Sequence, residues 1–79
     1  MNKKWLIPFS WEEVMVGDRI ILEWDKIREA YLVMGKKLDT LIVKTYYGRI
    51  HNFNTEECLR RISLIDRRPR YKWLLWIYN

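Results

Sequence analysis

Residues 14–24 constrain the fold more than any other part of the sequence, because an apolar run there meets a glycine-aspartate pair and continues as an alternating segment. Glycine adopts the positive φ that a sharp corner often needs, and a short Asp side chain bonds back to nearby backbone. After Gly17-Asp18, apolar Ile20, Leu22 and Trp24 alternate with Arg19, Ile21 and Glu23. This period of two is typical of a strand with one buried face, so the stretch predicts a corner and then the first strand of a small barrel.

Strand signals recur along the rest of the chain. Alternation over 29–34 and the β-rich composition of 38–47 predict a second and a third strand, and 50–53 predicts a short fourth strand. A further strand is predicted over 61–66. A basic turn then leads to a last extended segment over 71–78, which we expect to pair with 61–66 as a hairpin.

Two helical turns and an N-terminal arm complete the predicted elements. Ser10-Trp11-Glu12-Glu13 has the pattern of a capping box, in which the first and fourth residues cap each other's backbone amides. Asn54 is the predicted N-cap of a second turn over about 56–60, where two acids favour the helix dipole. Residues 1–9 form an extended arm whose apolar side chains pack on the barrel, and Pro8 bars that arm from a central strand position.

A chain of 79 residues makes one domain, and its 49% hydrophobic and 15% aromatic residues supply the apolar surface for one core. We predict a single domain over 1–79. Its parts are the arm and helical turn over 1–13, a barrel over 14–66, and a basic turn with a C-terminal strand over 67–79. The predicted fold class is mainly β, a small antiparallel barrel of five or six strands with one or two short helical turns.

Residues 14–66 contain four motifs in order: Val-x-x-Gly-Asp-Arg-Ile-Ile-Leu, a long polar-tipped hairpin, Leu-Ile-Val-Lys, and a short helical turn before Arg-Ile-Ser-Leu-Ile. This order resembles the SH3-like barrels, including KOW-type and Tudor-like modules. The resemblance implies an SH3-like barrel and, for KOW-type modules, binding to nucleic acid or the ribosome. Where KOW-type motifs have glycines after the first strand, this chain has Asp25-Lys26-Ile27-Arg28. The chain shows no obvious aromatic cage of the Tudor-like kind, although Trp24, Tyr31, Tyr46 and Tyr47 could be arranged into one.

The excess positive charge is confined to the C-terminal quarter of the chain. Residues 1–59 carry nine basic and nine acidic side chains, whereas residues 60–79 carry six basic and one acidic, which accounts for the net charge of +5. Cations neutralise phosphates, and flat rings stack on exposed bases. We therefore expect nucleic acid or a nucleoprotein complex to contact the basic and aromatic residues Arg60, Arg61, Arg67, Arg68, Arg70, Tyr71, Lys72, Trp73 and Trp76.

An acidic protein surface is the alternative partner, since Arg binds carboxylates through two parallel hydrogen bonds and stacks on rings. Segment 71–78 is apolar on both faces, so we expect the N-terminal arm or a second subunit to cover it. These features favour a protein-interaction module that docks or self-associates through this segment, such as the adaptors and inhibitors that small viral genomes encode. The apolar stretch 73–78 is too short and too weakly amphipathic to favour a membrane surface.

The sequence offers little for catalysis. It has no phosphate loop, nucleophile elbow or dinucleotide fingerprint, and one Cys58 with one His51 makes neither a zinc spacing nor a supported nucleophile. We predict no enzymatic activity, no cofactor and no metal. A single cysteine indicates a reducing compartment, and the three apolar residues between Lys4 and Pro8 are too few for a signal peptide, so we expect a cytoplasmic protein.

Overall fold

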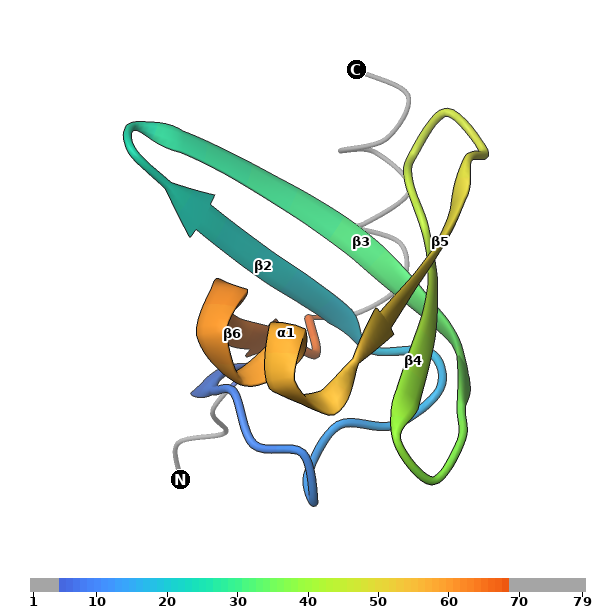
Figure 1. Ribbon diagram of the computed structural model, residues 1–79. Helices are drawn as coiled ribbons and strands as arrows, with labels where there is room; N and C mark the ends of the chain where they lie inside the picture. Colours follow the sequence, from blue (N-terminus) through green and yellow to red (C-terminus); the bar gives the residue numbers. More distant parts are fainter. Residues whose placement is uncertain (1–4, 69–79) are drawn as a thin grey trace.

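A computed structural model describes residues 5–68 of the chain. It contains six strands and one short helix within that range (Figure 1). Their bounds are β1 Leu6–Pro8, β2 Arg19–Trp24, β3 Ile27–Lys36, β4 Thr40–Lys44, β5 Ile50–Asn54, α1 Thr55–Arg61 and β6 Ile62–Asp66. The predicted mainly β class is confirmed.

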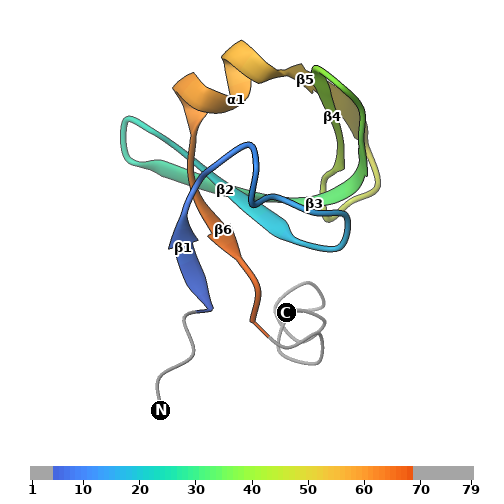
Figure 2. The ribbon, with the colours of Figure 1, turned by 90° about the horizontal axis from the view of Figure 1, so that it is seen from below.

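All six strands belong to one antiparallel sheet with the order β1-β6-β2-β3-β4-β5. Figure 2 shows that the sheet curls, with α1 lying over the open side between β5 and β6. Among residues 5–68, the outer strands β1 and β5 do not pair with each other, so the sheet is not closed. A closed barrel is therefore not what the described chain forms, because the connection from β5 to β6 is a helix that packs across the gap.

The core lies on the concave side of the curled sheet, between the strands and α1. Ile20, Leu41 and Ile65 are fully buried there, and α1 contributes the buried Cys58. The full cluster of buried residues is Val14, Ile20, Leu22, Val33, Leu41, Val43, Cys58, Ile62 and Ile65. The alternation predicted for 19–24 is confirmed for Ile20 and Leu22, which enter the core from one face of β2.

The predicted corner before β2 is present. Gly17 has φ 97°, and the Asp18 carboxylate accepts a hydrogen bond of 2.9 Å from the backbone amide of Met15. The corner also docks on β3, since the Gly17 amide donates to the Val33 carbonyl at 2.9 Å and the Val33 amide donates to the Asp18 carbonyl at 2.8 Å. The chain therefore enters β2 already fixed against its neighbour.

The N-terminal arm is partly as predicted. β1 is an edge strand paired with β6, a position that tolerates Pro8, and the side chains of Ile7 and Phe9 pack against the core. The prediction of a capping box at Ser10 is wrong. Ser10 Oγ donates to Glu12 Oε1, and the residues that follow form a turn closed by Glu13 and Val14 amides on the Ser10 carbonyl rather than a helix.

The second predicted helical turn is confirmed as α1, with the predicted N-cap. The Asn54 side chain accepts from the Glu57 amide at 2.8 Å, and the Glu57 carboxylate accepts from the Asn54 amide at 3.4 Å. These two bonds form a capping box, which satisfies amides that the first turn of a helix leaves without partners.

Other predicted bounds differ from the structure. The third strand is limited to Thr40–Lys44, because Leu38 lies in an exposed turn and 45–49 forms another turn. Arg19 and Ile21, on the face of β2 opposite the core, are also buried, so the predicted polar face is not solvent-exposed there. The predicted hairpin of 61–66 with 71–78 has no free edge on β6, since β1 and β2 occupy both sides of that strand, and 71–78 lies outside the described residues.

Candidate functional site

Two of the arginines predicted to bind phosphate form ion pairs with carboxylates of the same chain. Arg67 Nε is 3.2 Å from Asp18 Oδ1, and Arg67 Nη1 is 3.5 Å from Glu13 Oε1. Arg68 Nη2 is 2.6 Å from Asp66 Oδ2, and its Nε is 2.9 Å from Asp66 Oδ1. Arg67 therefore joins the residue after β6 to the corner before β2, and Arg68 folds back on the last residue of β6.

Asp66 is the buried centre of this group of charges. Its carboxylate also lies 3.8 Å from Arg19 Nη2, and both of these side chains are almost fully buried. Burial by itself raises the pKa of Asp66, but hydrogen bonds from the Arg68 side chain and amide, with the charges of Arg68 and Arg19, outweigh burial and hold the pKa below its usual value. The ion pairs of Asp66 with Arg19 and Arg68 therefore stabilise the folded chain.

Arg60 and Arg61 lie in the last turn of α1, where cations interact favourably with the helix dipole. Both side chains are exposed, and within residues 5–68 neither makes an ion pair with a carboxylate. They are available to an anionic partner. The five remaining predicted contact residues lie outside the described part of the chain: Arg70, Tyr71, Lys72, Trp73 and Trp76.

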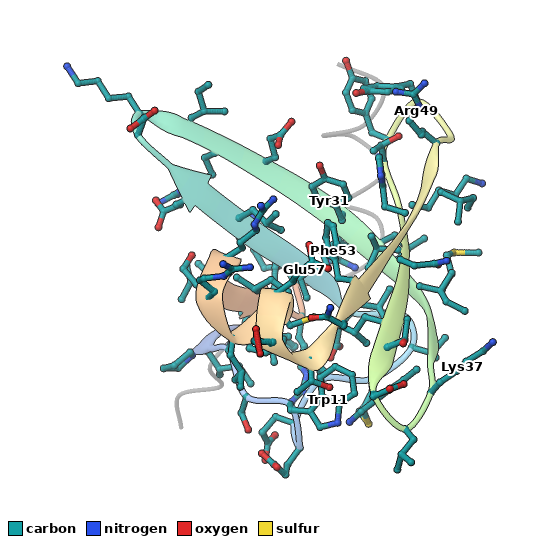
Figure 3. All side chains as sticks on the ribbon, in the orientation of Figure 1. Trp11, Tyr31, Lys37, Arg49, Phe53 and Glu57 are labelled. Carbon is teal, nitrogen blue, oxygen red and sulfur yellow. The ribbon has the colours of Figure 1, made fainter. Side chains whose placement is uncertain are left out.

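A second basic and aromatic surface lies on the turn between β4 and β5; sequence reasoning named Tyr46 and Tyr47 only for an aromatic cage and did not connect them with the cations of this turn. Tyr46 and Tyr47 are 61% and 68% exposed, and their rings meet edge to face with centroids 5.0 Å apart. Arg49 is exposed at the tip of the same hairpin (Figure 3). The available signal was the absence of any Asp or Glu from residue 40 to residue 55, in a stretch that contains Lys44, Arg49 and four aromatic or imidazole rings.

Three further rings continue this surface along the concave side of the sheet. The Tyr31 ring lies 5.9 Å from His51 and 5.7 Å from Phe53, centroid to centroid, and Figure 3 shows Tyr31 and Phe53 side by side between β3 and β5. Burial raises the pKa of Tyr31, and Glu29 and Tyr47 add to the shift. Tyr31 is therefore packed against the core, while Tyr46 and Tyr47 pair on the turn. The side chain of Trp24, the fourth residue named for a cage, lies outside the described part of the structure.

The sequence predictions also concern metal-ligating groups and the one cysteine. No group of three or more His, Cys, Asp or Glu residues that could hold a metal ion occurs in the described range. Burial, and to a lesser degree the charge of Glu57, raises the pKa of Cys58 to about 11, so this thiol stays protonated at neutral pH. The helix described within residues 5–68, α1, is not long and apolar enough to cross a membrane.

No protein-family model, curated protein or solved structure matches this chain.

Proposed function

We propose that this protein is a small non-enzymatic binding protein that contacts nucleic acid, or the nucleic acid of a nucleoprotein complex, through its basic C-terminal part. The observation that carries the proposal is the distribution of charge, with six basic side chains and one acidic side chain over residues 60–79. Such an excess binds phosphates by releasing condensed counterions, without requiring a deep pocket.

The ion pairs of the fold support a choice among these cations. Arg67 and Arg68 already bind Asp18 and Asp66, whereas Arg60 and Arg61 are exposed without a carboxylate partner in the described range. We assign the phosphate contacts to Arg60 and Arg61 together with Arg70 and Lys72, which lie outside the described residues.

The test is binding of labelled single- and double-stranded DNA and RNA at 50 and 200 mM salt. Wild-type protein should bind, and the affinity should fall steeply with salt. Replacing Arg60, Arg61, Arg70 and Lys72 by Gln should lower the affinity and flatten the salt dependence, because about one phosphate contact is lost per residue. Arg67 and Arg68 are left unchanged, since replacing them would break the ion pairs of β6. Absence of binding at low salt would refute the proposal.

A protein-interaction module is the second candidate, and the open edge of β5 favours it. Within residues 5–68, β5 pairs only with β4, so its other edge presents unpaired backbone groups that can accept a further strand. The Thr45 amide bonds to the Arg49 carbonyl and the Thr55 amide to the Asp39 carbonyl. Because antiparallel bonds alternate, the amides of Ile50 and Asn52 point to the open edge.

Replacing Asn52 by Pro tests this candidate, because it removes an edge amide and keeps the bonds between β4 and β5. If the edge recruits a strand from a second copy or a partner, the variant should be monomeric by light scattering where the wild type associates. An Asn52→Ala variant is the matched control and should associate as the wild type does. A wild-type protein that stays monomeric, with no partner recovered from cell extract, would refute the candidate.

A further inference from the structure

We propose that the turn between β4 and β5 is a second nucleic-acid contact, at which Tyr46 and Tyr47 stack on unpaired bases and Arg49 and Lys44 meet the adjoining phosphates. This inference rests on the proposed function and specifies its ligand as a single strand. Stacking needs an open base face, which a single strand offers and the interior of a duplex does not.

The backbone of the turn is fixed independently of the two tyrosines. The Thr45 amide donates to the Arg49 carbonyl at 2.8 Å, and the Gly48 amide donates to the Thr45 carbonyl at 3.0 Å. The Arg49 amide donates to Thr45 Oγ1 at 2.9 Å, and Gly48 supplies the positive φ of 94°. Thr45, Gly48 and Arg49 therefore close the turn, and the fold does not require aromatic residues at 46 and 47.

The two rings are presented in a form that leaves surface for a ligand. They meet at an interplanar angle of 76°, so the edge of one ring rests on one face of the other, and the two residues remain 61% and 68% exposed. Large aromatic side chains contribute much binding area when covered, and Tyr is enriched at interfaces because its ring is apolar and its hydroxyl is polar. A fixed turn also reduces the ordering that binding requires.

The charges beside the rings favour an anionic ligand. Arg49 is exposed and Lys44 half-buried, and no ion pair joins either side chain to a carboxylate within residues 5–68. The sequence from residue 40 to residue 55 contains no acid. By contrast, Lys36 is held by the Trp11 and Val14 carbonyls and lies over the Trp11 ring, so it belongs to the fold.

The experiment measures binding of a fluorescein-labelled 15-nucleotide oligo(dT), oligo(U) and a 15-base-pair duplex by anisotropy. Tyr46→Ala and Tyr47→Ala should each weaken binding to a single strand by roughly tenfold, whereas Tyr46→Phe and Tyr47→Phe should stay within about twofold because they keep the ring. Arg49→Gln should reduce the slope of log affinity against log salt by about one. Lys37→Gln, which removes a cation at the opposite end of β4 (Figure 3), is the matched control and should leave the slope unchanged.

The outcomes separate this inference from the proposed function. Wild-type protein that binds single strands, with Tyr→Ala variants of unchanged affinity, would overturn the stacking site and leave the proposed function standing. Equal affinity for the duplex and the single strand would overturn base stacking in the same way. Absence of binding to every probe would remove the proposed function and this inference together. Unchanged thermal midpoints for the Tyr46 and Tyr47 variants show that any loss is a loss of contact.

Discussion

Replacing Asp66 by Asn tests the buried ion pairs that join β6 to β2. Asp66 and Arg19 are 3% and 5% exposed, and their side chains approach to 3.8 Å. Asn keeps the shape of the side chain and removes its charge. Removing one partner of a buried pair typically costs about 3–5 kcal/mol, because the charge that remains is still desolvated and has lost the attraction of the group removed. Arg68 Nη2 lies 2.6 Å from the Asp66 carboxylate, but the Arg68 side chain is half-exposed, so water can solvate it when the carboxylate is removed. We therefore expect the cost in the free energy of unfolding to be at the lower end of this range, about 3 kcal/mol.

A loss of this size is a large part of the total stability. A chain of 79 residues has a free energy of unfolding of about 4–12 kcal/mol, so about 3 kcal/mol would lower the thermal midpoint by roughly 12–24 °C. The assay is urea and thermal unfolding followed by Trp fluorescence. Glu23→Gln, which removes the exposed ion pair to Arg28 at 2.7 Å, is the control and should shift the midpoint much less.

The pH dependence gives a second test of the same carboxylate. The ion pairs hold the pKa of folded Asp66 below its unfolded value, so its contribution is fully present above about pH 4 and is lost as the pH falls through the folded pKa. The difference between wild type and Asp66→Asn should therefore shrink below about pH 4. A loss under about 1 kcal/mol at pH 7, or a difference that does not change with pH, would refute the reasoning.

Three further predictions concern single positions. Gly48→Ala should cost about 1–2 kcal/mol in the free energy of unfolding, because φ is 94° there; a free energy within error of the wild type would contradict the turn geometry. Asn54→Ala should cost about 1 kcal/mol through loss of the capping box of α1, with a lower urea midpoint and an unchanged slope. Because Cys58 is fully buried, a thiol reagent at pH 8 should label folded protein only as fast as the chain opens, and the pKa of about 11 slows the reaction further; prompt labelling would show an open thiol.

The local elements followed from short-range chemistry. The strand over 19–24 and the N-cap Asn54 with its acidic first turn each depend on neighbouring residues, and both are confirmed, although Arg19 and Ile21 on the second face of the strand are buried too. The capping box at Ser10 has the same sequence pattern and is wrong. The chain there is held instead by Lys36, whose ammonium donates to the Val14 carbonyl at 3.2 Å, and by the corner that docks on β3. A local pattern decides the structure only where no stronger distant contact competes with it.

The candidate sites show the same difference between local sequence patterns and contacts made by distant residues. The charge asymmetry of the sequence indicated the arginines of the C-terminal quarter. It did not indicate that Arg67 forms an ion pair with Asp18 and that Arg68 forms one with Asp66. Those pairs join residues 49 positions apart or depend on the burial that β2 and β6 provide together. Tyr46 and Tyr47 were named in the sequence only as cage residues, and their position on an exposed turn was missed because the β-rich composition of 38–47 predicted one continuous strand.

The sequence by itself determined that this chain is mainly β, where its corner and its second helical turn lie, and that its excess charge is C-terminal. These properties depend on residue type and on contacts between near neighbours. The tertiary structure decided that the sheet stays open, that Arg19 and Asp66 are buried together, and which cations remain exposed. Burial and ion pairing between distant segments depend on strand order and register, and no single segment of the sequence contains that information.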